Sequence, residues 1–372
     1  MKKPRLVCTL VVAAAACLAA GAAWAYEGPV KVGESVAVYF ETPHPTAPVK
    51  AGQLAWREVI GWPGASYIAV HFSKFDLAPG ERVEIRTPDG SRSYTFTGEG
   101  KPGRGGNFWA THVPGDACEV ILWGNGQRPG NGFAIDKFAH GFPLPPEVKD
   151  QEAAPEPEAD PRSICGTDDS LWAKCYETSE PTIYQRGRAV ARRLIGGEGA
   201  CTGWLIGCNG HVITNNHCIG SQADASDTDF EFMAEGATCA TSCASWLGCP
   251  GTVVASNSTL VQTSANEDYA LVQLPTNPTG TYGYLQLRPA GAAIGERMYL
   301  LGHPAAWGKR FSVASTASQD PGGFSLVYSD NEASCWGTAP PPDLGYFADP
   351  QGGSSGSPVL AYSDHRVLGL PH

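Results

Sequence analysis

The sequence feature that most constrains the fold is a succession of short apolar runs separated by glycine, proline and asparagine, with no helical periodicity between them. Residues 66–72, 82–86 and 94–97 are rich in aromatic and β-branched side chains, as strands are. The Pro-Asp-Gly sequence at 88–90 provides a hairpin turn between the last two runs. The pattern predicts an all-β protein that begins with a β-sandwich accessory domain over residues 26–142.

A change of composition divides the chain. Residues 143–163 contain six prolines and six acidic residues, and almost no apolar side chain. Such a segment cannot bury enough surface to order itself, and its like charges keep it extended. We therefore expect an acidic linker here. Short strands resume over residues 164–372, and their number predicts barrels or sandwiches for this second domain.

The first 25 residues have the features of an export signal. Three basic side chains precede the apolar run 6–20, and Ala-Trp-Ala at 23–25 provides a cleavage site. The run is shorter than the ~20 residues that a membrane span needs. A lipid anchor on Cys17 is the alternative. We expect a secreted protein, extracellular or periplasmic, whose mature chain begins at Tyr26.

The charge of the chain argues against some classes of partner. Its formal net charge is −11 and its pI is about 5.3, so it offers no broad basic surface for phosphate backbones. We therefore expect no nucleic-acid partner and no membrane-surface role. We also expect no membrane span, because the apolar run at 6–20 is too short and no later segment compensates.

Ten cysteines remain after signal cleavage, and an exported chain favours disulfides over free thiols or metal ligands. Cys239, Cys243 and Cys249 have a metal-like spacing, but they include no CxxC pair and no neighbouring histidine. We favour a disulfide-bonded loop over a zinc site here, and we expect no cofactor. Cys118 is the only cysteine of the first domain, so it is either free or bridged to the second domain.

A candidate nucleophile lies in the stretch Gly-Gly-Ser-Ser-Gly-Ser-Pro-Val at 352–359. Glycines near Ser355 permit backbone conformations that direct its hydroxyl and the neighbouring N–H groups to one point. Glycine- and serine-rich runs are also common turns and linkers. The apolar residues 358–360 that follow argue against a linker.

A serine hydroxyl needs a base within hydrogen-bond reach and a third group that orients the base. His217 follows the apolar strand 212–214 in a polar turn, where its side chain can face a cleft. Asp268 directly precedes the apolar strand 269–274, so its carboxylate can be shielded from water. The order His, Asp, Ser predicts a catalytic triad of these two residues with Ser355.

Four motifs carry a resemblance to a known family: Cys-Thr-Gly-Trp-Leu-Ile at 201–206, His-Cys at 217–218, Asp-Tyr-Ala-Leu-Val at 268–272 and Gly-Ser-Ser-Gly-Ser-Pro at 353–358. They resemble the signatures of trypsin-like (chymotrypsin-fold) serine endopeptidases, nearest to bacterial lysyl and glutamyl endopeptidases. The likeness covers about residues 164–372. It implies a two-barrel catalytic domain with the triad between the barrels.

By this resemblance, His217 is the general base, Asp268 orients it, and Ser355 is the nucleophile. The N–H groups of Gly353 and Ser355 form the oxyanion hole. The resemblance also implies a disulfide between the cysteines that flank this histidine loop, which are Cys201 and Cys218.

Two departures from the family bear on activation. The sequence Arg-Leu-Ile-Gly-Gly at 193–197 looks like the activation site of animal trypsins, but it lies too close to Cys201 to release a strand. Ser354 stands where that branch has the aspartate that binds the new ammonium group. We therefore expect any activation to proceed by removal of the N-terminal segment.

The family also continues beyond the strand at 367–372 with an edge strand, a pocket wall and a helix. The resemblance therefore implies a catalytic domain that is truncated at its C-terminal end, with an unpaired edge and a single Cys165.

We expect a secreted serine endopeptidase that acts on proteins or peptides, with an accessory-domain ligand that the sequence does not identify. An α/β-hydrolase elbow is excluded, because it requires a second glycine where Ser357 stands and a histidine that comes last. The rival interpretation is a catalytically silent trypsin-like protein, with the sandwich as an adhesive or glycan-binding part.

Two residues bear on specificity. Asp349 lies six residues before Ser355, the interval at which animal trypsins carry the aspartate that attracts Lys or Arg. The alternative is that Asp349 caps a surface turn, since Asp-Pro is a turn signal. His372 lies where both glutamyl and lysyl endopeptidases have a histidine, so it discriminates poorly. We expect cleavage after Lys or Arg.

Overall fold

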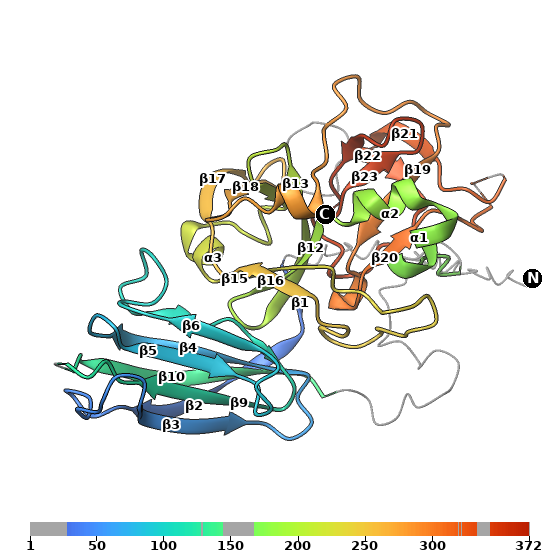
Figure 1. Ribbon diagram of the computed structural model, residues 1–372. Coiled ribbons are helices and arrows are strands. Elements are labelled where there is room, and N and C mark those ends of the chain that lie inside the picture. Colours follow the sequence, from blue (N-terminus) through green and yellow to red (C-terminus); the bar gives the residue numbers. More distant parts are fainter. Residues whose placement is uncertain are drawn as a thin grey trace, which may run out of the picture.

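The computed structural model describes residues 28–127, 129–143, 167–318, 320, 322–332 and 343–371. The expected signal at 1–25 and nearly all of the expected linker lie outside these residues, as do Cys165 and His372. The described chain is mostly β and forms two bodies, a lower β-sandwich and an upper unit with two curled sheets (Figure 1). The expected all-β fold, with a β-sandwich followed by a second β domain, is confirmed.

The sandwich consists of two antiparallel sheets, and burial alternates along β5 (Arg82–Arg86). In β5, Val83 and Ile85 are fully buried, whereas the charged residues between and beside them are only partly buried. The predicted hairpin joins β5 to β6. Phe72, Phe108 and Phe133 form part of the aromatic core between the sheets. One sheet has the order β2 (Gly33–Glu41), β10 (Gly132–Gly141), β4 (Tyr67–Asp76) and β7 (Phe108–Trp109), with β8 (Val113–Pro114) beside β4; the other has β3 (Leu54–Gly61), β9 (Ala117–Trp123), β5 (Arg82–Arg86) and β6 (Ser93–Phe96).

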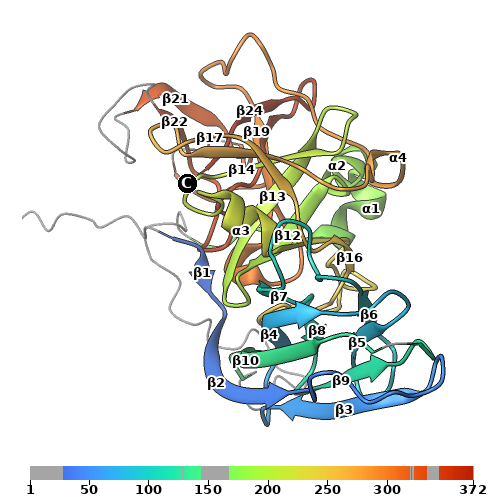
Figure 2. The same cartoon turned by 90° about the vertical axis from the view of Figure 1, so that its left-hand side faces the viewer.

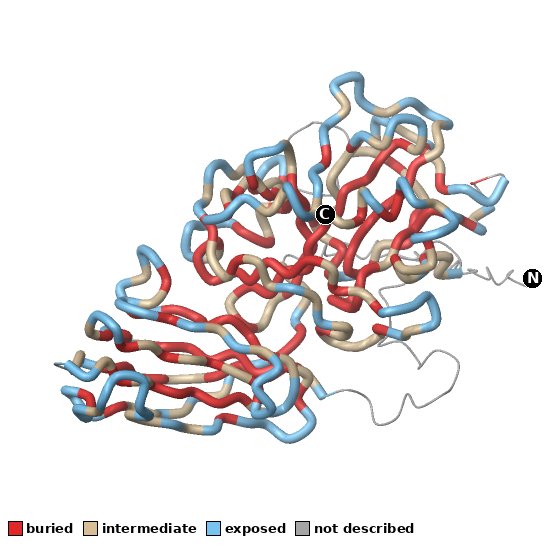
Figure 3. Tube along the Cα trace, in the orientation of Figure 1, coloured by how far each residue is buried: buried red, intermediate tan, exposed pale blue. Residues whose placement is uncertain are grey.

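The first sheet of the upper unit is the larger one. Its β12 is buried along its whole length, because this strand lies in the middle of the sheet (Figure 3). A capping box, in which Ser221 and Asp224 satisfy each other's backbone N–H groups, starts the short helix α3. The sheet order is β16 (Thr252–Ala255), β15 (Thr228–Phe232), β12 (Val190–Ile195), β13 (Gly199–Ile206), β14 (His211–Thr214), β18 (Tyr269–Gln273) and β17 (Thr259–Ser264), and α3 spans Gln222–Ser226.

The second sheet packs against the first across a shared apolar core. Trp204 and Phe230 of the first sheet contribute to this core, and Tyr299 and Phe311 contribute from the second. The strand order is β11 (Leu171–Trp172), β20 (Arg310–Ser312), β19 (Met298–Gly302), β23 (Val359–Ala361) and β24 (Val367–Gly369), with β21 (Val327–Glu332) and β22 (Asp343–Tyr346) as a separate pair. The remaining short helices are η1 (Ala173–Cys175), α1 (Tyr176–Ser179), α2 (Pro181–Gly187), α4 (Thr279–Tyr282) and η2 (Pro304–Ala306).

The first described strand departs from the expected domain boundary. β1 (Val30–Lys31) pairs with β13 of the upper unit, although residues 26–142 were expected to form the sandwich (Figure 2). Val32 is fully buried at the junction: its N–H donates to Glu198 of the upper unit (2.8 Å), and its carbonyl accepts from Phe142 of the sandwich (2.9 Å). The chain therefore enters the sandwich from the sheet of the upper unit.

The cysteines of the described residues are mostly paired. Disulfides join Cys175 to Cys239 and Cys243 to Cys249, so the cysteine cluster with metal-like spacing is disulfide-bonded as expected. Cys118 is free and buried, and burial raises its pKa to about 12. This result resolves the two alternatives for Cys118 in favour of a free thiol.

The helices of the described chain are short, and none has the length and apolarity that a membrane crossing requires.

Two histidines on strands of the sandwich are shielded from solvent and have aromatic or acidic neighbours. His71 and His140 are both buried, the first bonded to Asp136 (2.6 Å) and the second stacked on Trp62 at 4.2 Å between ring centres.

Candidate active site

His217 and Asp268 meet at the ends of two neighbouring strands, β14 and β18. The carboxylate of Asp268 accepts two hydrogen bonds from His217, one from the backbone N–H (2.9 Å) and one from Nδ1 (2.7 Å). The side chains are 4% and 0% exposed. Because the carboxylate accepts at Nδ1, it holds the proton there and fixes the ring orientation.

The backbone of Asp268 has a positive φ of 42°, a conformation that non-glycine residues adopt rarely. The buried amide of Asn215 donates to the Asp268 carbonyl (2.9 Å) and so stabilises this turn. The strained backbone is therefore part of what directs the carboxylate toward the histidine.

The serine loop consists of two consecutive turns. The N–H of Ser354 donates to Gln351 (2.8 Å), and the N–H of Ser357 donates to Ser354 (2.9 Å). The third position of each turn is a glycine with positive φ, +96° at Gly353 and +85° at Gly356. A Cβ at Gly356 would clash with the backbone of β13. Only glycine meets both demands, which explains the glycines on either side of Ser355.

Strand β13 holds the histidine loop and the serine loop together. Cys201 forms a disulfide with Cys218, the residue after His217. Next in the strand, Thr202 donates its N–H to the Ser355 carbonyl (2.8 Å) and its hydroxyl to the Gly353 carbonyl (2.9 Å). Sequence reasoning did not single out Thr202, although it lies in the motif at 201–206.

The sulfurs of Cys201 and Cys218 and a ring nitrogen of His217 lie close enough together to suggest a metal site. The two sulfurs are bonded to each other, so neither is available as a thiolate ligand.

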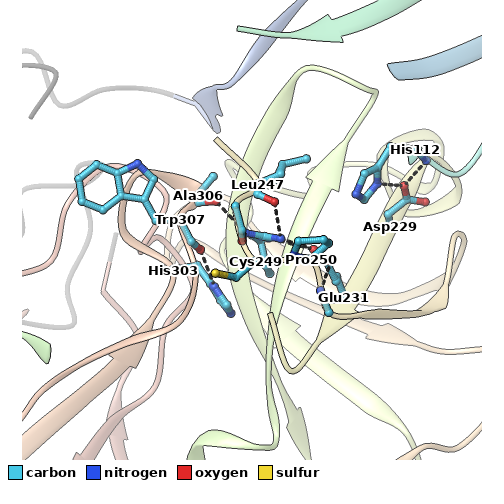
Figure 4. Close-up of polar contacts among 12 residues, drawn as sticks. His112, Asp229, Glu231, Leu247, Cys249, Pro250, His303, Ala306 and Trp307 are labelled. Atoms are coloured by element: carbon cyan, nitrogen blue, oxygen red, sulfur yellow. Dashed lines mark hydrogen bonds and ion pairs between the residues drawn. The ribbon is translucent and has the colours of Figure 1, made fainter. Parts of the chain in front are cut away.

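A buried ion pair supports the region behind the serine loop. Arg192 and Glu231 are both buried, and two guanidinium nitrogens bond one carboxylate oxygen at 2.9 and 2.7 Å. The remaining donors reach the carbonyls of Leu247, Gly248 and Ala306. Figure 4 shows Glu231, Leu247 and Ala306 gathered around this site. Every charge is thus paired or hydrogen-bonded, as burial requires.

His303 connects this region to β13. Burial, followed by the cations of Lys309 and Arg192, holds the pKa of His303 well below its usual value of 6.5, so the ring is neutral. Its Nδ1 donates to the Trp307 carbonyl (3.0 Å; Figure 4). Its backbone N–H donates to the hydroxyl of Thr202 (3.1 Å). The Thr202 hydroxyl therefore accepts a hydrogen bond from His303 while it donates one to the serine loop.

Arg193, the first residue of the trypsin-like activation sequence, lies within β12 and is fully buried. Its guanidinium donates to the Thr202 carbonyl (2.7 Å) and to the hydroxyl of Thr214, and burial lowers its pKa to about 9. A bond inside a central strand is inaccessible to a protease, which agrees with the expectation that this sequence is not an activation site.

Of the two residues considered for specificity, only Asp349 lies within the described part of the chain. Asp349 is 3% exposed, and its carboxylate accepts the backbone N–H of Asp169 (3.0 Å). The N–H of Asp349 donates to the hydroxyl of Ser312 (3.1 Å). Part of the bonding capacity of this carboxylate is thus used within the fold. His372 lies outside the described residues.

Known proteins resemble this chain in sequence and in structure. Residues 201–370 match the family model described as a trypsin-like peptidase domain. Among solved structures, Deg5 is 17% identical with a TM-score of 0.37, covering 52% of this chain and 84% of that chain. A Glu endopeptidase in complex with MPD is 16% identical with a TM-score of 0.34, covering 56% of this chain and 86% of that chain.

A curated relative covers more of the chain. The secreted RxLR effector protein 73 of Plasmopara viticola is 39% identical over an alignment of 326 residues, and the match covers 83% of this chain and 75% of that protein. The relative's secretion and the three disulfides of the described residues agree with an extracellular protein. The chain therefore belongs to the family of this secreted effector, and its residues 201–370 are a trypsin-like peptidase domain.

Proposed function

We propose that the chain is a secreted serine endopeptidase that uses His217, Asp268 and Ser355. The observation that carries the proposal is the double hydrogen bond from His217 to the buried Asp268 carboxylate beside the serine loop, which Thr202 of the same sheet binds. This bond keeps the proton on Nδ1, so that Nε2 is the basic nitrogen that a serine nucleophile needs.

In the proposed reaction, the Ser355 hydroxyl attacks the carbonyl carbon of the peptide bond, and its proton passes to Nε2 of His217. The oxyanion that forms is stabilised by the N–H groups of Gly353 and Ser355. His217 then gives the proton to the leaving amine, which leaves an acyl-enzyme, and water attacks the ester by the same route. Asp268 stabilises the imidazolium throughout.

A fluorophosphonate probe tests this proposal, because it reacts with an activated serine. Labelling of the full chain that disappears in Ser355→Ala is the expected result. A folded full chain that the probe does not label would instead favour a catalytically silent trypsin-like binding protein, with the sandwich as its adhesive part. The relative's name, a secreted effector, suits either function.

We also propose cleavage after Lys or Arg, with Asp349 as the recognising carboxylate. A buried carboxylate strongly favours a cationic partner. Kinetics on matched peptides with Lys, Arg, Glu or Phe before the scissile bond test this. A preference for Glu or Phe, or an unchanged preference for Lys and Arg in Asp349→Ala, would contradict it.

A further inference from the structure

The first described strand lies beside the serine loop. β1 adds to the sheet next to β13, where Val30 pairs with Ala200. Two residues further along β13, Thr202 bonds the carbonyls of Ser355 and Gly353. One strand thus contacts both the N-terminal strand and the loop that carries the candidate nucleophile.

The side chain of Val30 contacts the turn that contains the candidate oxyanion donor. A Cβ placed on Gly353 would lie 3.1 Å from Val30 Cγ1, and one placed on Gly352 would lie 3.6 Å from Val30 Cγ2. The same position on Gly353 lies 2.8 Å from the Ala306 nitrogen and 2.9 Å from the His303 carbonyl oxygen. The turn therefore contacts both Val30 of β1 and the backbone at η2.

Val30 is itself held in place. It packs against an apolar cluster that includes Val32, Leu194, Ala200 and Ala306. The backbone hydrogen bonds of Val32 to Glu198 and Phe142 fix the end of β1 between the two bodies. Lys31, the other residue of β1, is exposed. The strand therefore presents one apolar side chain to the serine loop and one charged side chain to solvent.

We propose that Val30 is a positioning residue for the oxyanion hole, an inference that rests on the proposed function. By filling the space beside Gly352 and Gly353, Val30 holds their turn in the conformation that directs the Gly353 N–H toward the oxyanion. The strand that leads into the sandwich is then part of the catalytic unit. Removal of the N-terminal segment would inactivate the enzyme, contrary to the activation route that the sequence suggests.

The expected loss of kcat in Val30→Ala follows from the oxyanion donor that the turn supplies. Loss of one oxyanion donor costs about 10²–10³ in kcat, because the donor acts mainly in the transition state. Truncation of Val30 loosens the turn without removing the donor. We expect Val30→Ala to lower kcat by roughly tenfold with KM changed by less than about twofold.

Kinetics of the full chain with a peptide substrate and the matching peptide aldehyde test this. The aldehyde forms a hemiacetal with the nucleophile, whose oxygen occupies the oxyanion hole, so its inhibition constant should rise together with the loss of kcat/KM. Val30→Ile should restore both values to within about twofold, and Lys31→Ala, on the exposed side of the strand, should leave them unchanged. Equal kinetics in Val30→Ala and wild type would overturn the proposal.

Hydrogen exchange gives a readout that does not need activity. The N–H groups of Ser354 and Ser357 close the two turns of the serine loop. Their exchange should become at least several-fold faster in Val30→Ala and remain unchanged in Lys31→Ala. Unchanged exchange in Val30→Ala would also overturn the proposal. A wild-type chain that shows no hydrolysis but the expected exchange difference would contradict the proposed function and leave the packing role of Val30 standing.

Discussion

Two buried histidine–aspartate pairs in this molecule have nearly the same hydrogen-bond lengths and different surroundings. In the first, Asp268 accepts from the N–H (2.9 Å) and Nδ1 (2.7 Å) of His217. In the second, Asp229 of β15 accepts from the N–H (3.0 Å) and Nδ1 (2.7 Å) of His112 in the sandwich (Figure 4). All four side chains are nearly inaccessible to solvent.

The difference lies in what each pair connects. The first joins two strands of one sheet and lies next to a disulfide that ties its loop to β13. The second joins the two bodies, and Asp227 extends it by accepting from Arg104 (2.8 Å) and from the N–H of Trp109 (3.2 Å). A buried histidine–aspartate pair therefore shows by itself only that the carboxylate has hydrogen-bond donors. The serine loop lies near the first pair alone, and this neighbour gives that pair a catalytic interpretation.

The largest expected effect separates the pairs by function. His217→Ala and Ser355→Ala should each lower kcat/KM for a peptide by a factor of about 10⁴ or more, and the double variant should be little worse, because the residues act as one unit. His112→Ala removes the same contacts elsewhere and should lower kcat/KM by less than about tenfold. Strictly additive losses, or an equal loss in His112→Ala, would remove the distinction.

The second effect concerns stability. Asp229→Ala leaves the N–H and Nδ1 of His112 buried without their acceptor, so we expect a loss of about 3 kcal/mol in the free energy of unfolding. Urea denaturation measures this loss. Asp116→Ala, which changes an exposed aspartate of the sandwich, is the control and should cost less than about 0.5 kcal/mol. Equal losses in both variants would show that the contact between the bodies contributes little.

The two pairs also show what sequence patterns can and cannot reveal. The catalytic candidate was predictable, because His217 and Asp268 lie in motifs beside apolar strands. His112 has no such motif, and its partner lies 117 positions away, so only the tertiary structure brings them together. The same holds for β1, whose two residues are too short a run to indicate which sheet they join.

Local patterns were reliable where burial alternates along a strand, as at 82–86. The short helix α2 was not predicted, because seven residues provide too little periodicity. The disulfide-bonded state of the cysteine cluster was predicted, but its bridge to Cys175 was not, since spacing does not determine connectivity.

A third expectation concerns the segment between the two bodies. Limited proteolysis should cut first between Pro145 and Arg162, because acidic, proline-rich chain is a poor candidate for burial. The contacts of His112 and β1 should keep the cleaved halves together, so they co-elute in gel filtration and separate only under denaturing conditions. Activity should change by less than about threefold. Separation of the halves under native conditions would contradict a docked sandwich, and initial cleavage inside residues 60–125 would contradict the domain division.

The smallest effect concerns the pH dependence of the contact between the bodies. Lys101 is 3% exposed and lies 3.9 Å from Asp227. Burial lowers its pKa from the usual 10.5, and the negative charges of Asp229 and Asp227 oppose this only in part. The unfolded chain therefore binds more protons than the folded chain between the lowered pKa and 10.5. In that window the free energy of unfolding should rise with pH, and below it the buried charge should destabilise the fold fully.

Lys101→Met isolates this contribution. The difference in unfolding free energy between wild type and Lys101→Met should shift in favour of wild type as the pH rises from the lowered pKa toward 10.5. Lys50→Met changes an exposed lysine of the same domain, so its difference from wild type should stay constant over the whole range. Urea midpoints at several pH values provide the measurement, and kcat/KM should not follow the same curve in either variant. A difference for Lys101→Met that falls or stays constant as the pH rises would show that the ammonium group is not buried against Asp227, and that His112 and Asp229 hold the two bodies together without it.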